Sequence, residues 1–161
     1  MKLAGLDFET ANGKSGSICA AGCAIVDDGA VTERKEWLVC PHKGYRWMRP
    51  DFTDIHGLSY WDVCDCAEFV DIWPELRRML LSADCVVIHN ARFDLGHLRS
   101  VLSLYGQSPV EFDYADSLTI SRRTMKSASY SERSTGTSST VPSSAVSVRS
   151  EEHTSELQSR E

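Results

Sequence analysis

The sequence predicts a single α/β domain whose sheet mixes parallel and antiparallel strands. Short apolar segments rich in β-branched residues alternate with two segments that have the apolar spacing of amphipathic helices. The turn Asp27-Asp28-Gly29 separates two of the apolar segments and indicates an antiparallel hairpin near the N-terminus. The chain has 161 residues, which is enough for one domain with its own core.

Three strands are predicted first, at residues 2–9, 18–26 and 31–39. Residues 41–61 are predicted to be irregular, because two prolines and a glycine interrupt any regular pattern there. This segment is rich in aromatic residues, which can pack the segment against the domain or stack on nucleic-acid bases. Packing is the more frequent role, and the sequence leaves both alternatives open.

The middle of the chain alternates helices with strands. Helices are predicted over residues 68–81 and 91–105, where apolar side chains recur at helical spacing. Residues 85–89 form a short β-branched strand between them, and residues 111–114 form another. A further helix begins over residues 116–123. Strands separated by helices in this order favour a sheet with parallel members.

The composition changes after residue 126. Residues 127–161 are rich in Ser and Thr and contain few large apolar side chains, so they cannot bury enough surface to offset their ordering entropy. We therefore expect a folded domain over residues 1–126 and a disordered tail over residues 127–161. Residues 149–159 resemble the translation of a sequencing-adapter oligonucleotide, which predicts that the tail is an artefact of the gene sequence.

The overall composition narrows the classes of function. The net charge is −6, so the chain has no basic field that would attract nucleic acid over its whole surface. Its six cysteines form no Cys-x-x-Cys pair or zinc-ligand pattern, and we expect reduced thiols in a cytoplasmic protein. No apolar stretch is long enough to span a membrane, and the N-terminus has no signal-peptide pattern.

Two acidic residues follow the first apolar run, in Asp7-Phe8-Glu9-Thr10. Because side chains alternate along a strand, Asp7 and Glu9 are expected on the same face, where two carboxylates repel each other. Mg2+ or Mn2+ would relieve this repulsion, since both prefer oxygen ligands. The alternative is an ordinary strand end with two solvated acids.

A second polar cluster, His89-Asn90-Ala91-Arg92-Phe93-Asp94, lies where a predicted strand leads into a helix. Asp94 falls in the first helical turn, where it can also complement the helix dipole. His89 has the alternative role of a hydrogen-bonded residue at the strand end. Each cluster alone therefore has an ordinary structural explanation.

Together the clusters resemble the DEDD family of 3′-5′ exonucleases, especially its proofreading members, the epsilon-type subunits of bacterial DNA polymerase III. Asp7-Phe8-Glu9-Thr10 is similar to the first family motif, and the segment from His89 to Asp94 is similar to the second. Ile55-His56-Gly57-Leu58 resembles the Ile-His-Gly segment between them. Residues 113–123 resemble the Asp-Thr-Leu-x-x-Ala-Arg stretch that follows. The resemblance covers roughly residues 1 to 123.

The resemblance implies a ribonuclease-H-like mixed β-sheet flanked by helices, and hydrolysis of nucleic-acid 3′ ends with two Mg2+ or Mn2+ ions. It implies that Asp7, Glu9 and Asp94 are catalytic metal ligands. It also implies that Thr10, His56 and Phe93 bind the terminal nucleotide. The expected partner is a single-stranded DNA 3′ end, with RNA as an open alternative, and a polymerase partner would fit the proofreading members.

The sequence departs from the family pattern in its last part. The family has a fourth acid on a final helix, preceded by a base in an HxxxxD or YxxxD motif, and neither motif follows Asp116. Tyr130, for example, has Ser134 where the acid would stand. We therefore expect a fold that is incomplete at its C-terminus, with apolar sheet surface uncovered, and low or no activity from this chain.

Two other classes of function compete with this one. A haloacid-dehalogenase-type phosphatase also has two acids after a strand, but its pattern is Asp-x-Asp, whereas this chain has Glu9 at the second place. The other is a non-catalytic nucleic-acid or protein interaction module that keeps the exonuclease fold. The missing fourth motif favours the module, and the intact acids of the first two motifs favour the enzyme.

Overall fold

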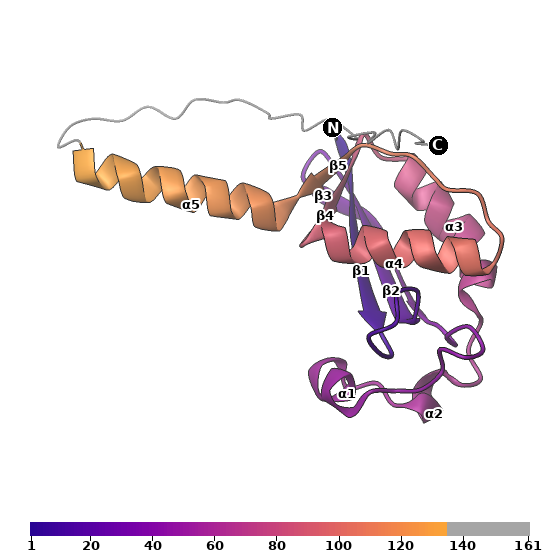
Figure 1. Ribbon diagram of the computed structural model, residues 1–161. Coiled ribbons are helices and arrows are strands. Elements are labelled where there is room, and N and C mark those ends of the chain that lie inside the picture. Colours follow the sequence, from indigo (N-terminus) through magenta and orange to yellow (C-terminus); the bar gives the residue numbers. More distant parts are fainter. Residues whose placement is uncertain (135–161) are drawn as a thin grey trace, which may run out of the picture.

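The computed structural model describes the backbone of residues 1–134 and the side chains of residues 1–125. A five-stranded sheet with the order β3-β2-β1-β4-β5 forms its centre (Figure 1). The strands are β1 (Lys2–Thr10), β2 (Ile18–Asp27), β3 (Ala30–Leu38), β4 (Cys85–Ile88) and β5 (Tyr114–Asp116). The helices are α1 (Pro50–His56), α2 (Tyr60–Val63), α3 (Phe69–Leu81), α4 (Ala91–Leu104) and α5 (Ser117–Ser134).

The sheet is mixed, as the sequence predicts. Strands β1, β2 and β3 form an antiparallel meander, while β4 is parallel to β1 and β5 is parallel to β4. The parallel pairs need crossover connections, which α3 and α4 provide. The α/β fold class predicted from the sequence is therefore confirmed.

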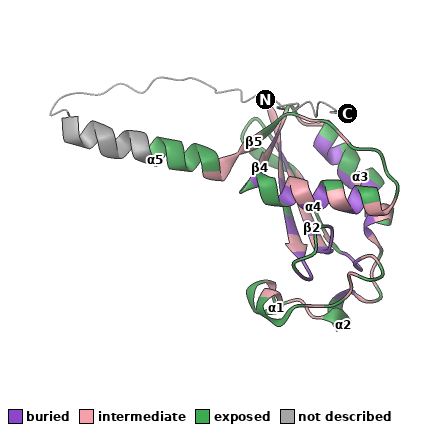
Figure 2. Cartoon of the chain, in the orientation of Figure 1, coloured by how far each residue is buried: buried purple, intermediate pink, exposed green. Residues whose placement is uncertain are grey.

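One face of the sheet carries the core. The buried side chains of β1 alternate with exposed or half-buried ones, and α3 and α4 bring their apolar faces against the buried set. Figure 2 shows buried residues along the strands, α3 and α4, whereas α1, α2 and the coloured part of α5 are mostly exposed. The core comprises mainly Ala4, Leu6, Phe8, Ala21, Ile25, Phe69, Trp73, Leu76, Met79, Val86, Ile88, Leu98 and Val101.

The opposite face of the sheet has a shallow hollow of about 540 Å³. Small residues form much of its floor, including Gly5, Gly22 and Ala24. Its lining comes from β1, β2, β3, β4, His89 and Ser117, so no side chain of α1 to α4 reaches it. The expectation of a fold that is incomplete at its C-terminus remains a prediction.

The segment over residues 41–61 is less irregular than the sequence predicts, because it contains α1 and α2. Pro50 occupies the first turn of α1, where its fixed φ suits a helix and its missing N–H is not needed. Gly57 ends that helix in the left-handed region at φ 77°. Helix α2 begins with a capping box in which Ser59 and Asp62 exchange hydrogen bonds. Two of the three residues expected to break structure, Pro50 and Gly57, are thus helix termini.

The C-terminal elements also differ in their bounds. The last strand is Tyr114–Asp116 rather than residues 111–114. Helix α5 runs to Ser134, so residues 127–134 of the predicted disordered tail are helical here. Residues 135–161, including the adapter-like stretch, lie outside the described residues. The proposed division at residue 126 therefore remains a prediction.

All six cysteines are free thiols, as expected from their spacing. Cys19, Cys23 and Cys40 are buried, and burial raises the pKa of the Cys19 thiol to about 12. Such thiols stay protonated and inert at neutral pH. No helix in the described part of the chain is both long enough and apolar enough to cross a membrane.

Candidate active site

Strand β1 carries two of the three predicted acidic residues. Asp7 is exposed, Phe8 is buried and Glu9 is half-buried, so Asp7 and Glu9 lie on the face opposite the core. Phe8 is held by an edge-to-face contact with Phe69, with ring centroids 6.1 Å apart. Packing of Phe8 therefore fixes the direction in which both carboxylates point.

The third acid comes from the first turn of α4. Pairing between β1 and β4 ends at Leu6 and Ile88, and the chain then turns through Asn90 at φ 62° into the helix. Beyond that last pair, the backbone N–H of Phe8 donates a hydrogen bond of 3.1 Å to Oδ1 of Asp94. Asp94 is only 2% exposed, so this bond places a buried carboxylate beside the β1 acids.

The three carboxylates interact electrostatically. Burial raises the pKa of Asp94 to about 6, the Phe8 N–H opposes this rise, and the charges of Asp7 and Glu9 add to it. Burial and the charge of Asp7 also raise the pKa of Glu9, while His56 lowers it. Negative charge is thus concentrated at one end of β1 with partial shielding from solvent.

This donor set fits a hard divalent cation. All three side chains offer carboxylate oxygens, which suit Mg2+ or Mn2+ better than the Cys and His ligands typical of structural zinc. Within the part of the chain that is described, no three His, Cys, Asp or Glu side chains converge closely enough to form a metal-binding group. Asp7, Glu9 and Asp94 are therefore neighbours rather than a closed ligand cage.

The predicted nucleotide-binding residues are placed unequally. His56 ends α1, its Nδ1 accepts the N–H of Leu58 at 3.1 Å, and its Nε2 is buried without a hydrogen-bond partner. Phe93 is 42% exposed, and its ring centroid lies 4.5 Å from that of His97. Thr10 is only 4% exposed, so its side chain is not open to a ligand. Phe93 is thus an accessible candidate, whereas the free nitrogen of His56 is buried and Thr10 can contribute mainly backbone.

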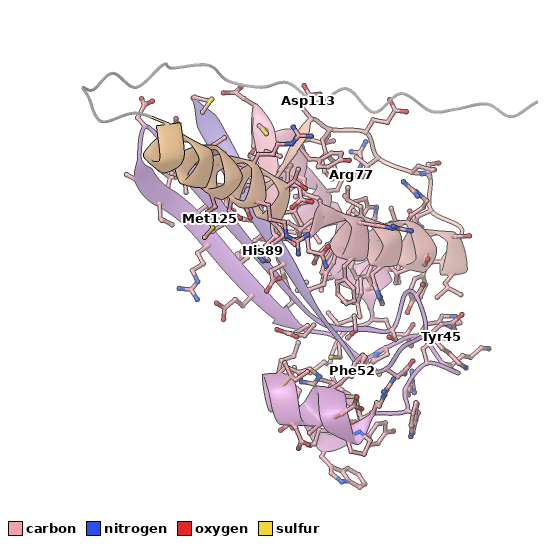
Figure 3. All side chains as sticks on the ribbon, turned by 60° about the vertical axis from the view of Figure 1, so that its left-hand side comes forward. Tyr45, Phe52, Arg77, His89, Asp113 and Met125 are labelled. Carbon is pink, nitrogen blue, oxygen red and sulfur yellow. The ribbon has the colours of Figure 1, made fainter. Side chains whose placement is uncertain are left out.

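The polar residues at the ends of β4 and β5 make hydrogen bonds that support the fold, as the sequence allowed for His89. His89 Nδ1 lies 3.1 Å from Ser117 Oγ, at the place where the sheet meets α4 and α5 (Figure 3). Asp116 Oδ1 accepts the N–H groups of Asn90 and Leu118, at 3.1 and 3.0 Å. Asp116 is therefore the residue that caps α5 and holds the start of α4, rather than a fourth acid of the site.

Two buried polar residues near the site were not anticipated. Asn12 is 1% exposed, and its Nδ2 donates to the carbonyl oxygens of Tyr45 and Trp47. His97 Nδ1 accepts the N–H of Gly16 at 3.1 Å. Both hold the loop after β1 in place. The position of His97 three residues after Asp94 on a helix is a signal that the sequence contains, whereas nothing local marks Asn12.

Comparisons with known proteins agree with this fold. A family model described as "RNase_T: Exonuclease" matches residues 5–145. A search of curated proteins found no match. Among solved structures, the chain is similar to "Exonuclease X in complex with 5' overhanging duplex DNA", with 24% identity and a TM-score of 0.59. That match covers 81% of this chain and 72% of the other.

Two further structures are similar at lower identity. Cell-death related nuclease 4 (CRN-4) is 13% identical with a TM-score of 0.67, over 89% of this chain and 51% of the other. The zinc ion bound form of an E. coli ExoI–ssDNA complex is 17% identical with a TM-score of 0.66, over 77% of this chain and 29% of the other. At these identities the structural matches show the fold alone, and the chain spans only part of the last two proteins.

Proposed function

Because the chain belongs to the RNase_T exonuclease family, we propose that its domain removes nucleotides from nucleic-acid 3′ ends, in the 3′-5′ direction of the DEDD exonucleases. The observation that carries this proposal is the hydrogen bond from the Phe8 N–H to Asp94. It brings together acids from two motifs that are far apart in the sequence. The resemblance to proofreading, epsilon-type members is a finer part of the same proposal.

We assign the metal-binding role to Asp7, Glu9 and Asp94. Two Mg2+ or Mn2+ ions held by such carboxylates would supply an activated water and would stabilise the leaving oxygen of the phosphodiester. The chain's own contribution is to hold the carboxylates in place. Asp94 is oriented by the N–H of Phe8. Glu9 follows Phe8 on β1, and the packing of Phe8 against Phe69 in the core fixes the direction of the strand there.

Three residues would hold the terminal nucleotide. The Nδ1 atom of His56 accepts a hydrogen bond, so its partnerless Nε2 carries a proton, which a nucleotide would accept once the buried ring is uncovered. The exposed ring of Phe93 offers a flat apolar surface for a sugar or base. Thr10 would contribute through the backbone that follows β1.

The substrate we propose is a single-stranded DNA 3′ end, with RNA as the alternative. The net charge of −6 argues against a strong general attraction to phosphates, so substrate would be held locally at the carboxylate site. Exonuclease X and ExoI are both described in complex with DNA, which supports this choice of partner. A polymerase partner and a cytoplasmic location follow from the epsilon-type resemblance and the free thiols, respectively, and are part of the proposal.

We further propose that this 161-residue chain has low activity by itself, with residues 1–126 as its exonuclease domain and residues 127–161 as an artefactual tail. No HxxxxD or YxxxD motif follows Asp116, and Asp116 itself is engaged in capping α5. A missing general base lowers rates by roughly 100- to 10,000-fold. The same observation favours the second candidate function, a non-catalytic interaction module with the exonuclease fold.

The test is a trimming assay with a 5′-labelled single-stranded oligonucleotide and Mn2+. Slow formation of a ladder of labelled products that shorten from the 3′ end, lost in Asp7→Asn and Asp94→Asn, would support the exonuclease. Trimming that is equal in those variants and the wild type would overturn the site. Strand binding without any trimming or Mn2+ binding would establish the non-catalytic module instead.

A further inference from the structure

Three large aromatic side chains stand exposed at the end of the molecule that holds α1 and α2. Trp61 is 82% exposed, Trp47 is 64% exposed and Tyr60 is 38% exposed. We refer to these three residues as the aromatic lip. The neighbouring Tyr45 and Phe52, labelled in Figure 3, are half-buried and pack against their surroundings. The sequence left open whether the aromatic residues of this segment pack against the domain or stack on bases. Tyr45 and Phe52 pack, whereas the three rings of the lip are exposed.

The aromatic lip is anchored from beneath. Val63 of α2 is fully buried against Ala11 and Cys19, and Met48 and Leu58 pack on the same small cluster. This second core lies directly after β1 and is separate from the main one. Helix α2 therefore presents Val63 inward and Trp61 outward, so the exposure of Trp61 follows from how the helix is seated.

Hydrogen bonds fix the other half of the lip to the end of β1. Asn12 Nδ2 donates to the carbonyl oxygen of Trp47 at 2.7 Å. The backbone N–H of Arg49 donates to the carbonyl oxygen of Ala11, also at 2.7 Å. The backbone of Trp47 is therefore held against Asn12. Asn12 lies two residues after Thr10, which ends the strand that carries Asp7 and Glu9.

The same segment leads to the candidate active site from its other side. His56 ends α1, close enough to Glu9 for the two side chains to interact electrostatically. Gly57, Leu58 and Ser59 then connect α1 to α2, where Tyr60 and Trp61 are in edge-to-face contact with centroids 5.4 Å apart. The lip is thus linked to the candidate active site twice, through the hydrogen bonds of Trp47 and Arg49 to the residues after β1 and through the short segment from His56 to Tyr60.

The surroundings of the lip are polar, which suits a nucleic-acid strand better than an apolar partner. Lys14 Nζ lies 5.2 Å from the centre of the Tyr45 ring, and the Arg49 guanidinium lies 5.0 Å from that of Phe52. Along the chain, Lys14 follows Asn12 by two residues and Arg49 follows Trp47 by two residues. Arg49 is also paired with Asp51, Asp62 is engaged in capping α2, and Asp54 and Asp65 are exposed on the same segment, so the surface is polar and of mixed charge rather than basic. Rings separated by cations are typical of single-strand binding surfaces.

We propose that the aromatic lip stacks on unpaired bases of a single nucleic-acid strand, a few nucleotides behind the 3′ end that enters the carboxylate site. The position of the 3′ end rests on the proposed function, whereas the stacking itself does not. Stacking requires only the flat face that all bases share, so the lip would bind DNA and RNA strands with little sequence preference.

The test measures strand binding without hydrolysis. Fluorescence anisotropy in EDTA would give the affinities of wild type, Trp47→Ala and Trp61→Ala for labelled oligo(dT) of roughly 12 nucleotides and roughly three nucleotides. We expect each alanine variant to bind the longer strand about 5- to 100-fold more weakly, and the short strand unchanged. Trp61→Phe should keep most of the affinity, because it keeps a ring. Val31→Ala, at a 65% exposed site on β3, is the matched control and should bind like the wild type.

Two further strands sharpen the result. An abasic oligonucleotide of the same length should bind the wild type as weakly as oligo(dT) binds Trp61→Ala. Oligo(rU) tests the effect of the sugar and should bind the wild type about as well as oligo(dT) does. Equal affinity of wild type and both alanine variants for the longer strand would overturn the lip and point to a protein-binding surface instead. So would equal binding of the abasic and base-bearing strands by the wild type.

The outcome is separable from that of the proposed function. Binding in EDTA does not depend on the metal ligands, so Asp7→Asn should keep the stacking contribution even though it loses trimming. If Asp7→Asn trims like the wild type, the exonuclease proposal fails while the lip is unaffected. If Trp61→Ala binds normally while Asp7→Asn loses trimming, the lip fails and the exonuclease proposal holds.

Discussion

The backbone N–H of Phe8 donates a hydrogen bond to Oδ1 of Asp94, and this bond joins the end of β1 to the first turn of α4. It is made where β1 and β4 cease to pair, so it takes the place of a missing strand–strand hydrogen bond. It also holds a buried carboxylate beside Asp7 and Glu9. One contact thus serves both the fold and the candidate site.

Asp94 can be changed so that these two roles separate. Asp94→Asn keeps an oxygen that accepts the Phe8 N–H, and Asp94→Ala leaves that N–H buried without a partner. We expect Asp94→Ala to lower the free energy of unfolding by about 1–3 kcal/mol and Asp94→Asn to change it much less. Urea denaturation near neutral pH measures both. An Asp94→Ala variant as stable as Asp94→Asn would show that the hydrogen bond does not support the fold.

His97 should make stability depend on pH. Burial lowers its pKa from the ordinary value of 6.5, so the unfolded chain binds a proton that the folded chain does not. The contribution of His97 to the free energy of unfolding is therefore fully present above pH 6.5 and is lost as the pH falls below that value. We expect the stability advantage of wild type over His97→Gln to be smaller at about pH 5 than at about pH 7.5.

The measurement is the difference in unfolding free energy between wild type and His97→Gln at the two pH values. Other groups, including Asp94, titrate in both proteins and largely cancel in this difference. A difference that stays constant, or that grows as the pH falls, would contradict the assignment of a neutral, buried imidazole that accepts the Gly16 N–H.

Gly16 is under two constraints, and a matched glycine separates them. It has φ 93°, and an added Cβ would lie 3.2 Å from the backbone nitrogen of Val101. Gly29 has a similar φ of 83° but open space around it. We expect Gly16→Ala to lower the unfolding free energy by about 1–3 kcal/mol more than Gly29→Ala, because it adds a steric clash to the backbone strain. Thermal or urea unfolding of the two variants checks this, and equal losses would show that the loop can move away from α4.

The 161-residue chain should trim single strands slowly. We expect a rate about 100- to 10,000-fold below that of a family member with an HxxxxD or YxxxD motif, because neither motif follows Asp116 to supply a general base. The assay compares both proteins on one 5′-labelled oligonucleotide with Mn2+, and Asp7→Asn controls for a contaminating nuclease. A rate equal to that of the complete family member would show that another group supplies the base.

Local patterns predict most of the fold but only part of the site. Strands β1 to β3 and helices α3 and α4 follow from apolar periodicity, which is a local property. Helices α1 and α2 were missed because Pro50 and Gly57 look like breakers in the sequence and become helix ends once the Val63 cluster anchors the segment. Asp7 and Glu9 are predictable as neighbours because a strand alternates its faces.

The rest of the site depends on contacts between distant segments. The Phe8–Asp94 bond, the Asn12 bonds to Tyr45 and Trp47, and the burial of His97 all join residues that no local pattern connects. The exposure of Trp61 is of the same kind, since it depends on which side of α2 faces the small core. These features require the tertiary structure.

The most direct test of the central claim is Mn2+ binding measured by isothermal titration calorimetry. Wild type, Asp7→Asn and Asp94→Asn would be compared, with Asp116→Asn as a control in which a capping acid is changed. If Asp7, Glu9 and Asp94 hold divalent cations, wild type and Asp116→Asn bind Mn2+, and the other two variants lose most of that binding. Equal binding by all four proteins, or none by the wild type, would contradict the claim that these carboxylates form the metal site.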